Sequence, residues 1–282
     1  MLRTIFSLSI ILSLVACSNQ KPPVESTSEV APAPKGIQKG EIISKEITYE
    51  SDTVKMNGYI AYSDGSDKPR PGILLFHEWW GHTDYIRQRA DMLAELGYVA
   101  FAIDMYGDGK TASHPEDAGA FATAVVQNID QSEGRLMVAY KMLEDHPMVK
   151  KGDISAVGYC LGGSVALTMA NKGVNFDGVA VFHAGVTLVV NPTADLKSQI
   201  LIQNGGADPF IKQESVDYYK AVMDQLGKPY TYITFPGVKH AYTNKDADAI
   251  GEKFDMPLEY NAEADEKSWS NMVDFFAKIY PN

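Results

Sequence analysis

The sequence predicts a single α/β domain with a mostly parallel central sheet and helices on both faces. From residue 41 onward, short apolar segments alternate with segments of helical periodicity. Chains with this alternation form layered folds in which helices connect parallel strands. The run Gly72–Phe76 is apolar throughout, which is typical of a central strand buried on both faces.

The strands and helices follow from these patterns in order. Residues 41–50 and 54–62 should pair as an antiparallel hairpin at a sheet edge, with a turn at Ser51-Asp52. Further strands are predicted at 72–76, 98–104, 154–157, 179–182, 200–203 and 230–235. Helices are predicted at 84–96, 115–126, 132–144, 212–226 and 262–279, and another follows residue 160. The carboxyl ends of the parallel strands should carry the functional site.

The chain's first forty residues differ from this domain, which we place at 41–282. Residues 1–16 carry Arg3 and then an apolar run, the layout of a signal peptide that is too short to span a membrane. Leu14-Val15-Ala16-Cys17 resembles a bacterial lipobox, so cleavage before Cys17 and a diacylglycerol on its sulfur are expected. An ordinary signal peptide cut near Ala16 is the alternative. Residues 17–40, rich in Pro and Ser, should form a disordered tether.

The lipobox implies an exported protein, lipid-anchored in the bacterial cell envelope and facing the periplasm. Ser18, rather than Asp, follows the lipidated position, which by resemblance to bacterial lipoproteins favours the outer membrane. The chain has two cysteines, Cys17 and Cys160. If Cys17 is lipidated, Cys160 has no partner for an intramolecular disulfide, and it should then be either buried or used in chemistry.

Composition restricts the partners. The 282 residues include 36 acidic and 25 basic side chains, a formal net charge of −11. This charge argues against nucleic acid and provides no basic face for anionic lipid. The charge says little about the substrate, and we favour a monomer.

A sharp turn follows the strand at 154–157. Gly158-Tyr159-Cys160-Leu161-Gly162 is a G-x-C-x-G version of the G-x-S-x-G nucleophile elbow. Glycines flank the tip because an elbow packs strand against helix and holds its central residue in a strained conformation. At the N-terminus of the next helix, Cys160 would be favoured as a thiolate. A buried structural cysteine is the alternative.

Two later loops supply partners for such a nucleophile. Asp208 follows the strand at 200–203, and His240 follows the strand at 230–235. The order nucleophile, acid, histidine is the order of an elbow-type triad. Taken singly, Asp208 could be a turn residue before Pro209 and His240 an exposed loop residue.

Three segments resemble the dienelactone hydrolase family of α/β-hydrolases: Gly158–Gly163, Gly205–Pro209 and Pro236–Ala241. The resemblance runs from about Tyr49 to the C-terminus and implies an α/β-hydrolase fold without cofactor. It implies that Cys160 is the nucleophile, His240 the base and Asp208 the residue that orients it.

The same resemblance assigns a role to Glu78, at the end of the third strand, as the acidic residue that contacts the resting thiol. Elbow geometry together with the resemblance places the oxyanion hole at the backbone N–H groups of Leu161 and Trp79. The implied reaction is attack of the Cys160 thiolate on an ester or lactone, followed by hydrolysis of the acyl-thioester.

The chain departs from the family where the founding enzymes bind a substrate carboxylate through two arginines. The corresponding positions lie near Asp108, where Lys110 is a partial substitute, and at Asn244. A dienelactone is therefore not the expected natural substrate. Further candidates for the substrate pocket are aromatic or imidazole side chains that could equally belong to the core: Trp80, Tyr106, His183 and Tyr242.

Two other interpretations stay open. The chain could be a carboxylesterase or thioesterase for larger acyl groups, or a non-catalytic envelope lipoprotein that uses the fold as a binding scaffold. A metal site is not expected: His77, Glu78 and His82 form H-E-x-x-x-H after a strand, rather than a histidine pair four residues apart on a helix.

Overall fold

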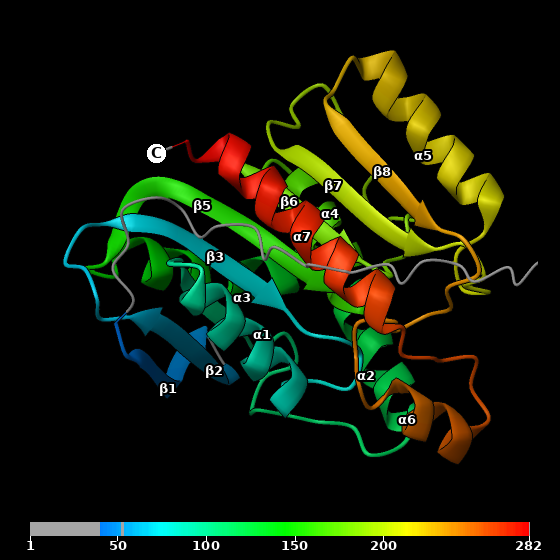
Figure 1. The fold of residues 1–282 in the computed structure, drawn as a ribbon, viewed down its shortest axis with the longest axis horizontal. Coiled ribbons are helices and arrows are strands. Elements are labelled where there is room, and N and C mark those ends of the chain that lie inside the picture. The colour runs from blue at the N-terminus through cyan, green and yellow to red at the C-terminus, as the bar shows by residue number, and fades with distance from the viewer. Residues whose placement is uncertain (1–39, 52–53, 282) are drawn as a thin grey trace, which may run out of the picture. The chain divides into compact units, whose positions relative to one another are not determined.

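The computed structural model describes residues 40–51 and 54–281, and these contain one eight-stranded sheet with helices on both faces (Figure 1). The strand order is β1-β2-β4-β3-β5-β6-β7-β8. Strands β3 to β8 are parallel, whereas β1 and β2 form an antiparallel hairpin whose second strand pairs with β4. The predicted fold class and the edge hairpin are confirmed.

The strands are β1 (Ile42–Ser51), β2 (Val54–Ser63), β3 (Arg70–Phe76), β4 (Val99–Ile103), β5 (Val149–Tyr159), β6 (Gly178–Phe182), β7 (Gln199–Gly205) and β8 (Tyr230–Phe235). The helices are α1 (Asp84–Glu95), α2 (Pro115–Gln127), α3 (Ile129–Glu144), α4 (Leu161–Asn171), α5 (Gln213–Leu226), α6 (Ala247–Phe254) and α7 (Ala262–Ile279).

Side-chain alternation along β3 divides the core into two layers. Leu74 and Phe76 belong to the cluster that includes residues of α3, α4 and α5, whereas Ile73 and Leu75 belong to the cluster that includes residues of α1 and α7. Successive residues of a strand face opposite sides of the sheet. The sheet is thus covered on both faces, and Figure 1 shows α7 crossing β6 and β7 on the face that it shares with α1.

The largest differences from the predictions are the starts of two elements and one additional helix. Strand β5 begins at Val149 instead of residue 154. The sequence did not predict this earlier start, because residues 150–152 are exposed and carry no apolar pattern. Helix α3 begins at Ile129 instead of residue 132. Helix α6 was not predicted, since its only buried residues are Ala247 and Gly251, which form no apolar stripe.

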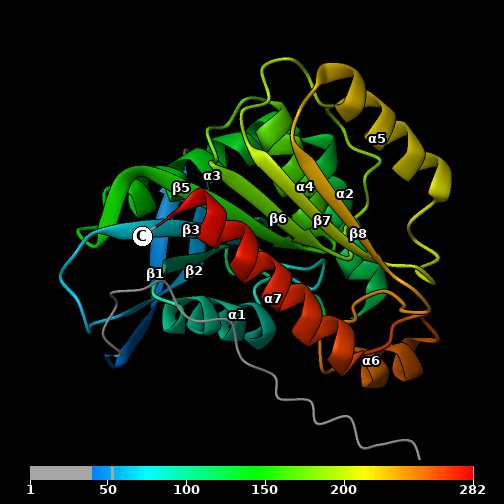
Figure 2. The ribbon, with the colours of Figure 1, turned by 45° about the horizontal axis from the view of Figure 1, so that its top comes forward.

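The parallel strands direct their following loops to one edge of the sheet. These loops carry all the predicted catalytic residues, and Figure 2 shows α6 at the same end of the molecule. Within the described residues, none of the helices has the length and apolar character required to cross a membrane. The predictions for residues 1–39, including Cys17, lie outside the described residues.

Candidate active site

The turn between β5 and α4 has the strained geometry expected of an elbow. Cys160 has φ +53° and ψ −120°, a conformation that residues with a side chain rarely adopt, and it caps α4. A Cβ on Gly158 would lie 2.6 Å from the Gly162 carbonyl oxygen, and one on Gly162 would lie 2.4 Å from the Phe76 carbonyl oxygen. Strand and helix can therefore pack this closely only with glycine at both positions.

Cys160, His240 and Asp208 lie in a hydrogen-bonded row. His240 Nε2 is 3.2 Å from Cys160 Sγ, and His240 Nδ1 is 2.6 Å from Asp208 Oδ2. The other carboxylate oxygen of Asp208 accepts a hydrogen bond from Phe210 N–H at 2.9 Å, so both oxygens are held. These are the contacts that a nucleophile, its base and an orienting acid require.

The loops after β7 and β8 approach one another closely enough to bring Asp208 to His240. Ala207 N–H donates to the Val238 carbonyl at 2.9 Å, and a Cβ on Gly205 would lie only 2.2 Å from that carbonyl oxygen. Glycine is therefore required here because the backbones of two loops that are distant in sequence come into direct contact.

The charge on His240 is governed by its two partners. Burial alone disfavours the imidazolium, but the Cys160 thiolate and the Asp208 carboxylate outweigh it and raise the pKa of His240 to about 10. The ring lies between two aromatic neighbours in edge-to-face contact, Phe210 at 5.0 Å and His183 at 5.1 Å. Phe210 is half-exposed and was not among the predicted site residues.

Glu78 lies buried on the loop after β3 with one defined partner. Asn244 Nδ2 donates to Glu78 Oε2 at 2.7 Å. Burial raises the pKa of Glu78 to about 7, although the Asn244 hydrogen bond acts in the opposite direction. Glu78 and Asn244 were predicted from different parts of the chain, and the structure brings them together.

The two candidate oxyanion donors lie where the elbow and the β3 loop end. Leu161 is the first residue of α4, so its N–H has no partner within the helix. In the stretches 40–51 and 54–281, the Trp79 N–H makes no hydrogen bond to a backbone carbonyl. Both groups are thus free to bind an oxyanion.

Of the predicted pocket residues, Trp80 and Asn244 line one cavity of about 390 Å³. Its far wall is α6, including Ile250 and Phe254, and the Phe254 ring stacks on that of Trp80 at 6.0 Å. Lys110 instead pairs with Asp108 at 3.3 Å on the surface.

Two pocket predictions, Tyr242 and His183, need correction because neither side chain has any exposed surface, whereas Tyr106 is about as exposed as Trp80 and stays a prediction. Tyr242 has no exposed surface and donates to the Gln203 carbonyl, so it belongs to the core. His183 is also fully buried behind His240, where it contacts Thr243 Oγ1 at 2.7 Å. Tyr106 is almost fully buried, and its hydroxyl donates to the Trp79 carbonyl at 2.8 Å.

The histidines of the H-E-x-x-x-H segment contact backbone groups. His77 contacts Glu78 O and Met105 N, and His82 Nε2 lies 3.0 Å from the Ala102 carbonyl oxygen. In the part of the chain that the structure describes, no group of three or more His, Cys, Asp or Glu side chains is arranged to hold a metal ion.

Comparison with known proteins identifies the chain's relatives. A family model described as the dienelactone hydrolase family matches residues 56–280. The chain belongs to the dienelactone hydrolase family. The match covers both the elbow and the loops of Asp208 and His240, and it confirms the resemblance seen in the sequence motifs.

Relatives of this dienelactone hydrolase family member are distant in sequence but similar in fold. Protein usf of Aquifex pyrophilus is 27% identical over 236 residues, which cover 82% of this chain and 96% of that protein. A carboxymethylenebutenolidase of Pseudomonas putida is 28% identical over 153 residues, 52% of this chain and 64% of that enzyme. A dienelactone hydrolase-like promiscuous phosphotriesterase from metagenomic libraries has a TM-score of 0.78 at 24% identity, covering 85% of this chain and 99% of that one.

Family membership makes the chain a hydrolase acting on ester bonds. It therefore favours an enzyme over the non-catalytic scaffold that the sequence left open. The roles of individual residues remain predictions, based on the geometry described above.

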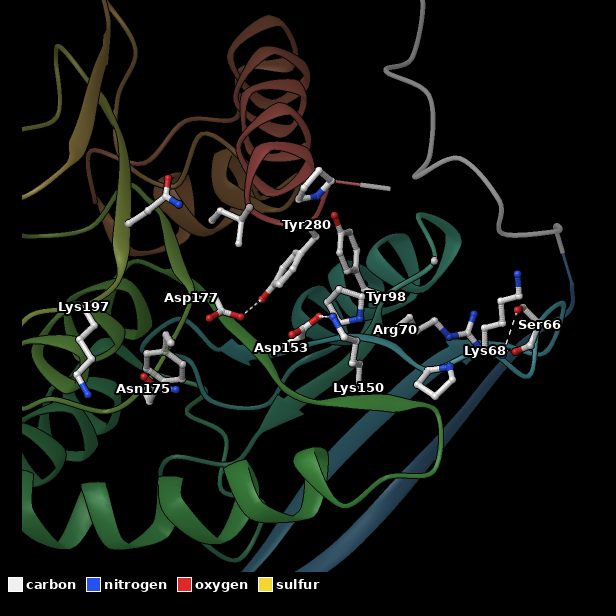
Figure 3. Close-up of a pocket in the computed structure, with 17 residues that line it drawn as sticks. Ser66, Lys68, Arg70, Tyr98, Lys150, Asp153, Asn175, Asp177, Lys197 and Tyr280 are labelled. Carbon is white, nitrogen blue, oxygen red and sulfur yellow. Dashed lines mark hydrogen bonds and ion pairs between the residues drawn. The ribbon is translucent and has the colours of Figure 1, made fainter.

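A larger cavity, of about 910 Å³, lies near the amino ends of the parallel strands (Figure 3). Its lining includes Lys68, Arg70 and Lys197, together with Asp177, which accepts a hydrogen bond from the Tyr280 hydroxyl at 3.0 Å. None of the predicted site residues is among those that line this cavity in the described part of the chain. The cavity is separate from the dienelactone hydrolase site.

Proposed function

We propose that the chain hydrolyses small esters or lactones through a Cys160-His240-Asp208 triad and an acyl-thioester intermediate. The observation that carries this proposal is the row of contacts at the elbow, 3.2 Å from Sγ to Nε2 and 2.6 Å from Nδ1 to Oδ2. A thiolate beside an imidazolium is an activated nucleophile whose base is already protonated for the leaving group.

The reaction would run in two halves. The Cys160 thiolate attacks the carbonyl carbon, and the N–H groups of Leu161 and Trp79 stabilise the oxyanion. The tetrahedral intermediate collapses to a thioester as His240 gives its proton to the leaving alkoxide. His240 then takes a proton from water, and the resulting hydroxide cleaves the thioester to the acid and the free thiolate.

Glu78 would control the thiol before substrate arrives. A carboxyl group with a pKa near 7 gains and loses its proton near neutral pH. Asn244 donates to the Glu78 carboxyl group without carrying a charge, so it leaves the exchange available.

Neutral substrates fit the residues beside this site. Asn244 stands where the founding enzymes of the family have an arginine, and its amide is already bound to Glu78. The cavity that Asn244 lines has the rings of Trp80 and Phe254 on its walls, together with the charged side chains of Asp84, Asp246 and Lys253, and the two rings suit an apolar or aromatic group of the ester. A substrate carboxylate would find no guanidinium at position 244 to bind it.

Hydrolysis of an ester and lactone panel by wild type and Cys160→Ala tests the proposal. We expect the variant to lose at least about 10³-fold in kcat, as variants that lack a nucleophile do. Acyl chains of increasing length separate small esters from the larger substrates of a carboxylesterase or thioesterase. Equal turnover by the two proteins would exclude a catalytic thiol.

The lipid anchor is a separate proposal, supported by the lipobox at Leu14–Cys17. We infer that Cys17 carries diacylglycerol and holds the enzyme in the bacterial cell envelope, with the domain facing the periplasm. Cys17→Ser should abolish incorporation of labelled palmitate and release the protein from membranes. Cys160→Ser is the matched control and should retain both; a labelled Cys17→Ser protein would contradict the anchor.

A further inference from the structure

The imidazole of His77 is held between two backbone groups that allow only one tautomer of the ring. Met105 N–H donates to His77 Nε2 at 3.2 Å, and His77 Nδ1 lies 2.6 Å from the Glu78 carbonyl oxygen. A backbone N–H can only donate and a carbonyl oxygen can only accept. The ring is therefore neutral, with its proton on Nδ1, and it donates to the Glu78 carbonyl.

Burial keeps the ring in this state. His77 has no exposed surface, and burial lowers its pKa to about 4, although the hydrogen bond to Glu78 acts in the opposite direction. The ring is consequently neutral throughout the pH range of ordinary ester hydrolysis. A protonated ring would lose its acceptor for the Met105 N–H.

The hydrogen bond from His77 acts on the peptide group that carries the Trp79 N–H. The Glu78 carbonyl and the Trp79 N–H belong to the same planar peptide. The carbonyl oxygen also accepts a hydrogen bond from Gly81 N–H at 3.1 Å. Two donors on one end of a peptide fix its orientation and polarise it, which strengthens the N–H donor at the other end.

The neighbouring peptide is held as well. The Tyr106 hydroxyl donates to the Trp79 carbonyl at 2.8 Å, and the Tyr106 ring packs against His77 at 4.8 Å. Through Met105 and Tyr106, the loop after β4 thus supports the loop after β3 on both sides of Trp79.

We propose that His77 is a positioning residue for the oxyanion hole, holding and polarising the Glu78–Trp79 peptide so that the Trp79 N–H stabilises the oxyanion. This inference rests on the proposed function, because the oxyanion exists only if Cys160 attacks a carbonyl group. It gives the histidine of the H-E-x-x-x-H segment a role that neither a metal nor the triad provides.

Two reactions of the same thiol separate this role from a general effect on Cys160. Acylation by p-nitrophenyl acetate forms a C–S bond, breaks a C–O bond and passes through an oxyanion. Alkylation by iodoacetamide forms a C–S bond and releases iodide from a tetrahedral carbon without an oxyanion. Loss of oxyanion stabilisation should therefore slow only the first reaction.

The test is the ratio of the two rates in His77→Phe, which keeps a ring against Tyr106 but loses both hydrogen bonds. We expect acylation to fall about 10–100-fold, somewhat less than removal of a whole oxyanion donor costs, with alkylation within about twofold of wild type. His77→Gln, whose amide can both donate and accept, should recover most of the ratio. His82→Phe is the matched control, since His82 is a buried histidine of the same loop that bonds the Ala102 carbonyl instead.

An unchanged ratio in His77→Phe, or an equal loss in both reactions, would overturn the inference. If that variant does not fold, the nitrogen NMR signals of wild-type His77 report which ring nitrogen carries the proton. The neutral Nδ1–H form is expected between about pH 6 and pH 8, and an Nε2–H or protonated ring would overturn the inference. A wild type no faster than Cys160→Ala would instead remove the proposed function itself.

Discussion

Burial acts on two acid–base side chains of the candidate site, His240 and Glu78, with different results. His240 has Cys160 and Asp208 at hydrogen-bond distance, and these two groups raise its pKa although burial acts in the opposite direction. Glu78 has the neutral amide of Asn244, and one neutral donor does not offset the loss of water around a carboxylate. The first residue is therefore held charged, whereas the second changes its charge near neutral pH.

Replacement of Glu78 by Gln should remove a pH-dependent part of the stability. The pKa of Glu78 is raised from 4.5 to about 7 on folding, so the folded state binds this proton more tightly than the unfolded state. Its stabilising contribution is complete below about pH 4.5 and is lost as pH rises through 7. The free energy of unfolding of wild type relative to Glu78→Gln should fall by on the order of 3 kcal/mol across this window.

Urea unfolding of both proteins at several pH values measures this difference. Glu252→Gln, on an exposed position of α6, is the matched control and should show the same pH dependence as wild type. A Glu78→Gln protein whose stability follows that of wild type at every pH would contradict the assignment of a raised pKa.

At the scale of elements, the β5–α4 elbow depends on backbone contact. Gly162 lies in the first turn of α4, where a Cβ would meet the carbonyl oxygens of Phe76 at 2.4 Å and His77 at 2.5 Å. These atoms belong to the end of β3 and the residue that follows it, so they cannot rotate away as a flexible side chain can. The helix and the β3 loop are thus held at a separation that only glycine permits.

Gly162→Ala should destabilise the protein by about 3 kcal/mol or more, because one methyl group must displace backbone. Gly119→Ala is the matched control: Gly119 lies in α2, and no atom of another element lies within 4 Å of its added Cβ. That change should stabilise the protein by about 0.5–1 kcal/mol through helix propensity. Similar unfolding midpoints for the two variants would contradict the close packing at the elbow.

At the scale of the whole molecule, Arg89 joins three segments that are far apart in the sequence. It lies buried on α1, pairs with Asp265 of α7 at 2.7 Å and donates to the Thr243 carbonyl in the loop that follows His240. The guanidinium also lies over the rings of Tyr159 and Trp269. One side chain thus connects both helices of this face to the loop that carries His240, the proposed base.

Arg89→Met should lower the free energy of unfolding by about 3–5 kcal/mol, since it leaves a largely buried carboxylate without its cation. Adding Asp265→Leu should recover much of that loss, because the uncompensated charge is then gone. Arg87→Met is the control on the same helix, where the pair with Glu46 is partly exposed and worth at most about 1 kcal/mol. A loss at Arg89 no larger than at Arg87 would show that the buried pair is unimportant.

Much of the fold was predictable from local pattern, and the exceptions have physical causes. Apolar runs and helical periodicity placed every strand and most helices, because those elements bury a regular set of side chains. The first residues of β5 are ordered by pairing between Arg70 and Val149, which an exposed polar segment does not signal. Helix α6 buries only two small residues and so leaves no periodic signature.

The candidate site divides in the same way. Cys160, Asp208 and His240 were predicted from motif and order, since an elbow and two strand ends are local features. The sequence left open whether Tyr242 and His183 face a pocket or the core, because the local pattern around such a side chain is the same in both cases. Nothing in the sequence pattern predicted that Phe210 contacts His240, apart from its position just after Asp208-Pro209.

The sequence by itself determined the α/β layers, the elbow and the residue types of the proposed triad, because periodicity, glycine placement and residue order are local features of the chain. Only the tertiary structure decided that Asn244 binds Glu78 across 166 residues and that Met105 fixes the proton of His77 across 28. Such contacts depend on which loops meet at the sheet edge. That meeting is set by the packing of the whole domain, which no single stretch of the chain encodes.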